Sequence, residues 1–294
     1  MNDEANLYGA IEAGGTKWVC AIGDESGELV ETETLPTTTP DETIGRAAAW
    51  LGKAGPLEAL GVGCFGPVDV HLSSPTWGYV TTTPKPGWAN TDVAPRLGAL
   101  LGTRVAFDTD VNAAAVGEQV RGAAVGLETF AYITVGTGIG AGIVVDGRVH
   151  HGLAHPEFGH MRVPHGPDDP FPGSCPFHGD CLEGLASGES MRQRWSRPAE
   201  ENDNDAAWQL EARYLAAGIV NLICTLSPQR VIVGGGVLAQ PVLLPLIRTH
   251  VGELLADYVA APEIVEPACG RDAGVLGALE LARWLVSSGR GPGG

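Results

Sequence analysis

The alternation of apolar and polar positions at the start of the chain predicts three strands followed by a helix. Residues 7–22 form two apolar runs around a glycine-rich turn, and 28–35 continues as a third antiparallel strand. From 41 to 51 the apolar positions recur with helical spacing, and Asp41 is the expected N-cap. This order predicts a β-meander that leads into a helix.

The rest of the chain alternates strand-length apolar runs with longer helical segments, which predicts an α/β fold. Residues 130–145 repeat the strand–turn–strand pattern, and Asp146-Gly147 is typical of a tight hairpin turn. We expect strands at 60–69, 105–109 and 231–233, and helices at 207–226, 243–256 and 275–285.

The length of the chain suits two domains. We divide it into an N-terminal α/β domain, 1–115, and a C-terminal α/β domain, 116–294, with the final helix packing back on the first. The glycine-rich tail, 289–294, is expected to be frayed.

The first strand–turn–strand segment carries a glycine turn that can bind an anion. The glycine torsions of Gly14 and Gly15 would let their amides converge on a phosphate, and Thr16 and Lys17 add a hydroxyl and a positive charge. The turn is not a Walker motif, and an ordinary hairpin is the alternative interpretation.

The second such segment has the turn Gly136-Thr137-Gly138. A strand and not a helix follows it, so the dinucleotide-binding fingerprint is not met. Two glycine hairpins, one in each half of the chain, favour a nucleotide held between two similar domains.

Two cysteines and two histidines after the second hairpin have the spacing of a metal site. His160 comes first, and Cys175, His178 and Cys181 follow as a C-x2-H-x2-C run. Two thiolates and two imidazoles suit tetrahedral Zn²⁺, and four protein ligands would make the metal structural. The alternative is a loop that clusters these residues without a metal.

Three carboxylates are candidates for chemistry on a polar substrate. Glu157 and Glu183 lie beside the proposed metal ligands in sequence, so a metal-bound segment would hold both in place. Asp110 ends a strand, where α/β sheets place ligands, although Asp in that position often caps the next helix. The loop 78–90 is rich in hydroxyl and amide groups, which suit either a carbohydrate or water.

Composition limits the partners and the compartment. The formal net charge of −17 argues against binding to nucleic acid. No apolar run is long enough to span a bilayer and no secretory leader pattern is present, so we expect a cytoplasmic protein without a membrane partner. Cys20, Cys64, Cys224 and Cys269 lie in apolar surroundings and are expected to be free thiols.

With these residues laid out, the chain resembles the ROK family of sugar kinases, and more closely its bacterial zinc-containing fructokinase branch. The resemblance runs from Gly9 to near Ala282. It implies an actin-like, ribonuclease-H-type ATPase fold, in which two α/β domains surround a cleft for ATP and a hexose. The matching motifs are Glu12-Ala-Gly-Gly-Thr-Lys17, Phe65-Gly-Pro-Val-Asp69, Thr81 to Trp88, Asp108-Thr-Asp-Val-Asn-Ala-Ala-Ala115, Gly136-Thr-Gly-Ile-Gly140, His155-Pro-Glu-Phe-Gly-His160 and Cys175 to Gly188.

The resemblance also implies roles for the matching positions. Asp110 would be the general base that takes the proton of the attacked sugar hydroxyl. Sugar-facing positions are Glu157, His160 and Glu183, with Asn90 and Asn112 as further candidates. Positions for ATP are Gly14, Gly15, Thr16, Lys17, Gly136, Thr137 and Gly138 at the phosphates, and Pro228, Gly235, Gly270, Arg271, Asp272, Ala273 and Gly274 beside the adenosine.

Among hexoses, the resemblance favours fructose. Many glucose-specific members carry Asp where this chain has Glu12, which is typical of the fructokinase branch and would support the Mg²⁺ of ATP through water. Glucose, mannose or an N-acetylated amino sugar remain alternatives.

The family also contains sugar-responsive transcriptional repressors, which form a different functional class. Those members have an additional N-terminal DNA-binding unit, whereas the first phosphate turn here begins soon after Met1. We therefore expect an enzyme, and both a monomer and a homodimer fit its sequence.

Overall fold

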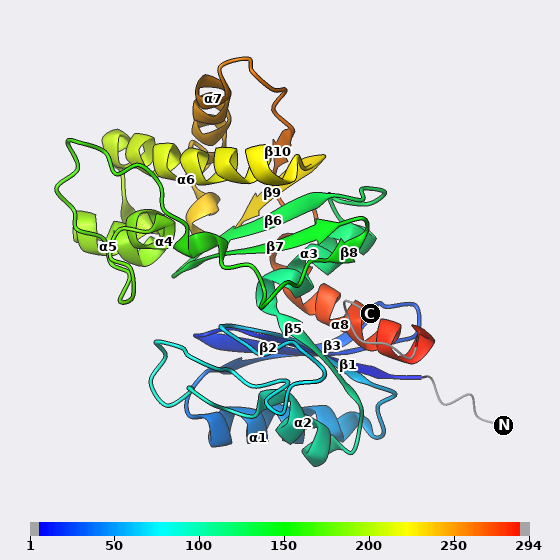
Figure 1. The fold of residues 1–294 in the computed structure, drawn as a ribbon. Coiled ribbons are helices and arrows are strands. Elements are labelled where there is room, and N and C mark those ends of the chain that lie inside the picture. The colour runs from blue at the N-terminus through cyan, green and yellow to red at the C-terminus, as the bar shows by residue number, and fades with distance from the viewer. Residues whose placement is uncertain (1–5, 289–294) are drawn as a thin grey trace. The chain divides into compact units, whose positions relative to one another are not determined.

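The computed structural model describes residues 6–288, so the tail at 289–294 lies outside the described residues (Figure 1). The chain forms two compact units. The first comprises the chain up to Gly126, Arg148–His155 and the part from Ala268 onward, and the second comprises Leu127–Gly147 and Pro156–Pro267.

The first boundary between the two units lies between Gly126 and Leu127, later in the chain than the expected boundary between residues 115 and 116. The reason is that α3 (Asp110–Arg121) packs along α8 (Ala273–Ser288), which keeps both helices in the first unit. Glycine makes this approach possible, because a Cβ at Gly277 would lie 1.6 Å from the Ala113 carbonyl oxygen.

The sheet of the first unit has the strand order β3-β2-β1-β4-β5. The β1–β2 and β2–β3 pairs are antiparallel, and β1–β4 and β4–β5 are parallel, so the predicted meander is continued by two parallel strands. The elements of this unit besides α3 and α8 are β1 (Tyr8–Ala13), β2 (Lys17–Gly23), β3 (Leu29–Pro36), α1 (Pro40–Leu51), β4 (Leu60–Cys64), α2 (Val93–Leu101), β5 (Val105–Thr109) and β8 (Arg148–Val149).

Alternate residues of β1 serve opposite faces of this sheet, as the period of two requires. Ile11 and Ala13 share a core with residues of α1 and α2, whereas Tyr8 and Ala10 pack with residues of α8. The helices α1 and α2 cover one face of this sheet and α8 the other (Figure 1). Glu12 is in register with Tyr8 and Ala10, so its side chain emerges on the α8 face.

Two helix starts in this unit are set by threonine. Thr39, not the expected Asp41, caps α1: its hydroxyl accepts a hydrogen bond from Glu42 N at 3.4 Å. Pro40 occupies the first helical position, where its fixed φ suits the helix and its missing N–H costs nothing. Thr109 caps α3 by accepting from Asn112 N at 3.0 Å, so the neighbouring Asp110 does not serve as this cap.

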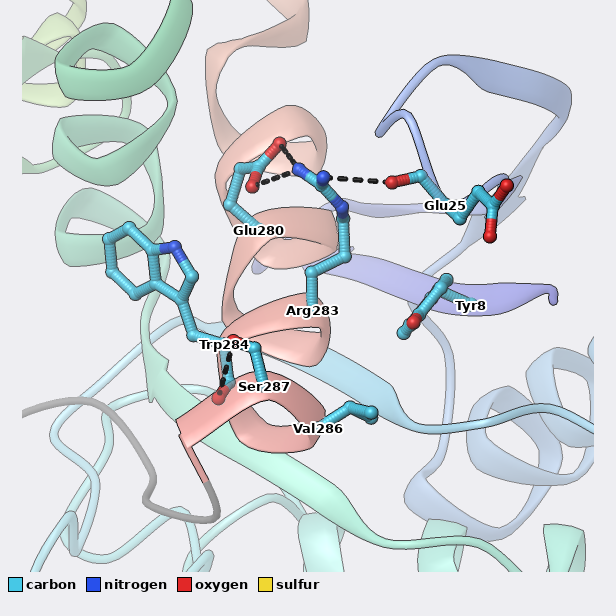
Figure 2. A pocket seen from close by; sticks show the side chains of 7 residues that line it. All are labelled: Tyr8, Glu25, Glu280, Arg283, Trp284, Val286 and Ser287. Carbon is cyan, nitrogen blue, oxygen red and sulfur yellow. Dashed lines mark hydrogen bonds and ion pairs between the residues drawn. The ribbon is translucent and has the colours of Figure 1, made fainter.

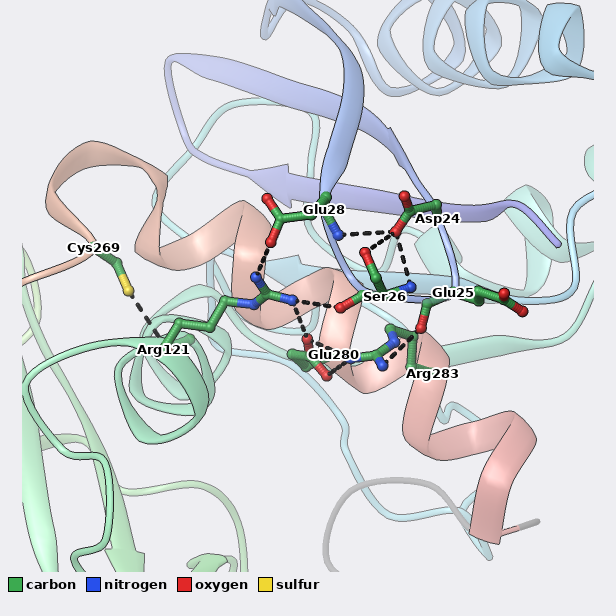
Figure 3. A network of polar contacts seen from close by, with 9 residues as sticks. Asp24, Glu25, Ser26, Glu28, Arg121, Cys269, Glu280 and Arg283 are labelled. Carbon is green, nitrogen blue, oxygen red and sulfur yellow. Dashed lines mark hydrogen bonds and ion pairs between the residues drawn. The ribbon is translucent and has the colours of Figure 1, made fainter. Parts of the chain in front are cut away.

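A polar network joins α3, α8 and the turn between β2 and β3 (Figure 3). Arg121 of α3 donates to Glu28 at 2.8 Å and to the Ser26 carbonyl at 2.9 Å, and it also contacts Glu280 at 3.4 Å. Glu280 of α8 is 2% exposed and pairs with Arg283 as well. A buried carboxylate is costly unless it is paired, so these contacts hold the two helices in register.

In the second unit the strands lie in the order β10-β9-β6-β7. The hairpin β6–β7 is antiparallel, whereas β9 runs parallel to both β6 and β10. Inward residues such as Ile133 and Val231 share one core with α6 and α7. The elements are β6 (Phe130–Val135), β7 (Ile139–Val145), α4 (Leu182–Ala186), α5 (Gly188–Trp195), α6 (Asp205–Leu226), β9 (Arg230–Gly234), α7 (Leu243–Leu255) and β10 (Glu263–Val265).

Between residues 6 and 288, no helix has the length and apolar character needed to cross a bilayer.

Candidate functional site

Asp110 is the first residue of α3 and directly follows β5. Its Oδ1 accepts a hydrogen bond from Val111 N at 2.9 Å. A Cβ at Gly63 of β4 would lie 2.5 Å from Ala113 Cβ and 3.3 Å from Asp110 Cα, so glycine lets the first turn of α3 approach the strand. The chain thus places this carboxylate at the carboxyl end of two parallel strands, where α/β proteins bind ligands.

Asp108, two residues earlier, is fully buried and is the centre of a hydrogen-bonded cluster. Its carboxylate accepts from Thr109 N at 2.8 Å, from Asn112 Nδ2 at 2.6 Å and from His151 Nε2 at 2.9 Å. Burial lowers the pKa of His151, but the hydrogen bond and charge of Asp108 outweigh it and raise that pKa overall. His151 does not belong to any motif recognised in the sequence. Only its distance from Asp108 in the structure identifies it as part of this cluster.

Asn112 and Asn90 are both in the first unit but in different surroundings. Asn112 is 1% exposed and belongs to the Asp108 cluster. Asn90 is exposed, has a φ of 58° and ends a loop that is anchored by the buried Trp88. The Trp88 indole N–H donates to the Thr38 carbonyl at 2.9 Å, so this loop is not simply solvated.

The first glycine turn lies next to the start of α8. Gly14 N donates to the Lys17 carbonyl at 2.9 Å, and a Cβ at Gly274 would lie 2.5 Å from Glu12 Cδ. Burial raises the pKa of Glu12, Lys17 lowers it and Asp272 raises it further. The structure therefore brings Glu12 and Lys17 together with the 270–274 turn, in which Gly270 has a φ of 58° and α8 begins at Ala273.

The expected torsional reason for the glycines of the first turn is wrong, and it does not apply to the second turn either. Gly14, Gly15, Gly136 and Gly138 do not have the positive φ that would require glycine. Space explains two of them. A Cβ at Gly14 would lie 2.8 Å from the Lys17 carbonyl oxygen, and one at Gly138 would lie 2.5 Å from Glu183 Oε2.

The second glycine turn is joined to its surroundings by backbone hydrogen bonds. Gly136 N donates to the Gly138 carbonyl at 2.9 Å, and Gly188 N, at the start of α5, donates to the Gly136 carbonyl at 2.7 Å. Thr137 at the tip is exposed. The backbone of the turn is therefore held by hydrogen bonds at Gly136, whereas its tip at Thr137 is exposed to solvent.

Two adenosine candidates lie at opposite ends of β9. Gly235 has a φ of 99°, and a Cβ there would lie 2.4 Å from the Val135 carbonyl oxygen, so it adjoins the second glycine turn. Pro228 precedes β9, and a strand of this length spans about 16 Å. The structure does not bring Pro228 to the group formed by Gly136 and Gly235.

The four proposed metal ligands lie together in the second unit, with their ligand atoms within 4.8 Å of one another. His160 Nδ1 is 3.7 Å from Cys175 Sγ and 3.6 Å from Cys181 Sγ, and His178 Nδ1 is 3.7 Å from Cys175 Sγ. Around tetrahedral Zn²⁺, with Zn–S of about 2.3 Å and Zn–N of about 2.0–2.1 Å, an S···N pair is about 3.6 Å apart. The donor set and its spacing therefore fit Zn²⁺.

Local backbone structure explains how the metal-ligand group forms. Cys175 and Gly179 exchange two backbone hydrogen bonds, and Gly179 takes a φ of 66° to close this turn. Cys181 then pairs with Arg162 in an isolated bridge, which brings the run back to the residues that follow His160.

Glu157 and Glu183 form a carboxylate pair beside these ligands. His160 Nε2 lies 3.9 Å from Glu157 Oε2, and His160 Nδ1 lies 3.7 Å from Cys175 Sγ. The Nδ1 atom of the ring therefore faces the proposed metal ligands, and its Nε2 atom faces Glu157. Burial and then the charge of Glu183 raise the pKa of Glu157 to about 7. Such a pair can accept hydrogen bonds from sugar hydroxyls.

A separate pocket of about 300 Å³ in the first unit is lined by none of the predicted site residues (Figure 2). Its cation, Arg283, donates to Glu280 at 2.5 Å and to the Glu25 carbonyl at 2.8 Å. The guanidinium thus serves the fold, and we do not assign a ligand to this pocket.

The sequence as a whole matches known sugar kinases. The ROK family model matches residues 8–284. A fructokinase from Zymomonas mobilis is 42% identical, with 96% of this chain and 98% of that protein covered. A fructokinase from Streptococcus mutans is 40% identical, with 96% and 99% covered.

The structure agrees with the sequence comparison. A ROK family glucokinase from Streptomyces griseus, solved with glucose and AMPPNP, aligns with a TM-score of 0.79 at 27% identity. The alignment covers 95% of this chain and 99% of that one. The predicted actin-like α/β fold is thereby confirmed. The chain belongs to the ROK family.

Proposed function

We propose that this protein is an ATP-dependent hexose kinase that converts D-fructose to fructose 6-phosphate. The observation that carries the proposal is the near-complete alignment with fructokinases at about 40% identity, with Asp110 of this chain at a strand end as the base.

In the proposed reaction Asp110 accepts the proton of the sugar 6-hydroxyl. The lone pair of that oxygen forms a bond to the γ-phosphorus of ATP, and the bond from the γ-phosphorus to the bridging oxygen breaks to release ADP. The transition state is loose, so positioning and electrostatic stabilisation supply most of the catalysis.

The nucleotide contacts are proposed for two groups of residues. In the first unit Gly14, Gly15, Thr16 and Lys17 would receive phosphates, with the 270–274 turn beside the adenosine. In the second unit Gly136, Thr137, Gly138 and Gly235 would serve. Mg²⁺ bound with ATP would neutralise phosphate charge, and the Glu12 carboxylate is the oxygen group that would support it through water.

The sugar would be held by the carboxylate pair and its histidine. Glu157, His160 and Glu183 provide acceptors and a ring N–H for hydroxyl groups, and Asn90 and Asn112 are further candidates. His160, Cys175, His178 and Cys181 would hold a structural Zn²⁺, which keeps the segments bearing Glu157 and Glu183 ordered.

A cytoplasmic location suits this reaction and the thiols. No disulfide joins any of the six cysteines, all of which lie between residues 6 and 288, and reduced cysteines are typical of reducing compartments.

The test is a coupled ADP-release assay with fructose, glucose, mannose and N-acetylated amino sugars. We expect the highest kcat/KM with fructose. A higher value with another hexose would replace fructose as the substrate, and ADP release that no sugar stimulates would overturn the kinase proposal.

A further inference from the structure

Two histidines hold the segment 148–155 against the rest of the first unit, and their Nε2 atoms have opposite roles. His155 Nε2 accepts a hydrogen bond from Val68 N at 3.0 Å, so it carries no proton. His151 Nε2 lies 2.9 Å and 3.1 Å from the two oxygens of Asp108. Because a carboxylate there can only accept, His151 Nε2 carries a proton and donates it.

The bond from His151 ends on a buried acceptor that holds other groups. Asp108 is 0% exposed, and the side chain of His151 is 14% exposed. The Asn112 amide must present its NH₂ group at 2.6 Å, because the carboxylate cannot donate. Asn112 Nδ2 and His151 Nε2 are 3.4 Å apart, and as two donors they converge on the shared carboxylate rather than bond to each other.

The hydrogen bonds of Asp108 and Asn112 lie on either side of Asp110, the proposed base, in the sequence. Asp108 accepts from Thr109 N, and the Thr109 hydroxyl accepts from Asn112 N. Asp110 and Val111 lie between the anchored residues Thr109 and Asn112. The turn from β5 into α3 is therefore fixed by side chains on both sides of the carboxylate that would take the sugar proton.

We propose that His151 is a positioning residue for the sugar end of the site, and that through Asp108 it fixes the β5–α3 turn that carries Asp110. The inference rests on the kinase function proposed above and adds a residue to it. Loss of the His151 donor leaves a buried carboxylate short of a partner, and the turn then relaxes. A shift of about 1 Å in a reacting group is enough to cost about 10²-fold in rate.

The experiment compares His151→Ala with His151→Gln in steady-state assays in which hexose and ATP are varied separately. For the alanine variant we expect hexose kcat/KM to fall about 10- to 100-fold, the range of a hydrogen bond to a charged group, while KM for ATP changes less than about twofold. The glutamine variant keeps an N–H donor and should recover to within about threefold of wild type.

His71→Ala is the matched control. His71 Nε2 lies 2.9 Å from the Leu153 carbonyl, so this variant removes a histidine contact to the same segment without touching Asp108. We expect it to retain wild-type kinetics. An equal loss in His71→Ala and His151→Ala would assign the effect to the segment as a whole and overturn the role of the Asp108 bond.

Three other results would also reject the inference, given the usual size of such bonds. They are a fall in hexose kcat/KM of less than about threefold in His151→Ala, a rise in KM for ATP as large as the fall in hexose kcat/KM, or no recovery of hexose kcat/KM in His151→Gln. If the alanine variant does not fold by circular dichroism, Asp108→Asn tests the same bond, because the amide has one oxygen for three donors and cannot accept from all of them. Failure of the kinase proposal would appear in the wild type, with no hexose phosphorylated, whereas failure of this inference appears only among the variants.

Discussion

Glu183 Oε2 accepts a hydrogen bond from Ile139 N at 2.9 Å. This contact joins a carboxylate next to the metal-ligand group to the strand that follows the second glycine turn. A residue proposed for the sugar and a turn proposed for phosphate are therefore neighbours in the second unit, although they are 44 residues apart in sequence.

Gly138→Ala should weaken sugar binding more than nucleotide binding. The new Cβ would meet Glu183 Oε2 at 2.5 Å, so the carboxylate must move and weaken its bond to Ile139 N. We expect KM for fructose to rise about tenfold, as for a lost charged hydrogen bond. In a Glu183→Ala background the same change should have little further effect on that KM. Additive effects in this cycle would contradict a shared cause.

Asp110→Asn should lower kcat for fructose by about 10²- to 10⁴-fold, the usual contribution of a general base. The variant keeps the size of the side chain and an acceptor for Val111 N. Thermal unfolding should therefore stay close to wild type. More than about a tenth of the wild-type kcat in a folded variant would remove the general-base assignment.

Removal of zinc should weaken sugar binding before nucleotide binding. Elemental analysis of protein purified without chelators should find one zinc per chain. In a Cys175→Ser, Cys181→Ser double variant the segments around Glu157 and Glu183 lose their metal, so KM for fructose should rise more than KM for ATP.

Cys224→Ser is the control for zinc removal, because Cys224 is an exposed cysteine outside the metal-ligand group. It should retain both zinc and kinetics. Protein without zinc would refute the metal assignment, and an unchanged sugar KM in the double variant would separate the metal from the sugar site.

His151 should make stability depend on pH. Its pKa is raised in the folded protein, so folding favours the protonated ring. The stabilisation is fully present below the ordinary value of about 6.5 and is lost as pH rises through the folded-state pKa. Urea unfolding at several pH values should show the advantage of wild type over His151→Gln shrinking from about pH 5.5 to about pH 8.5. A difference that grows with pH would mean that the paired ring is neutral.

Gly277→Ala should destabilise the first unit strongly. A Cβ there would lie 1.6 Å from the Ala113 carbonyl, and neither backbone at the α3–α8 contact can yield easily. We expect a loss of about 3 kcal/mol or more in the free energy of unfolding. Gly45→Ala in α1 is the control, since its Cβ meets nothing within 4 Å, and it should stabilise by about 0.5–1 kcal/mol. Equal effects of the two changes would contradict the packing argument.

The sequence alone determined the order of elements and the composition of the His/Cys cluster proposed to bind zinc. Apolar periodicity located the β-meander, both glycine hairpins and the long helix α6, because these segments bury one regular face. The run from Cys175 to Cys181 could be identified from the sequence because side chains close in sequence need only a local turn to meet, here closed by Gly179.

Tertiary structure decided the features that depend on distant residues. His151 meets Asp108 across 43 positions, and the unit boundary moved beyond residue 115 because α8 returns to pack on α3. Two residues of the glycine turns, Gly14 and Gly138, follow the same rule: Gly138 is small because Glu183 lies where its Cβ would be, and not because of its own torsions. Sequence patterns over a few residues determine local backbone conformation. The space available to a side chain depends on residues that are distant in sequence and become neighbours only in the folded chain.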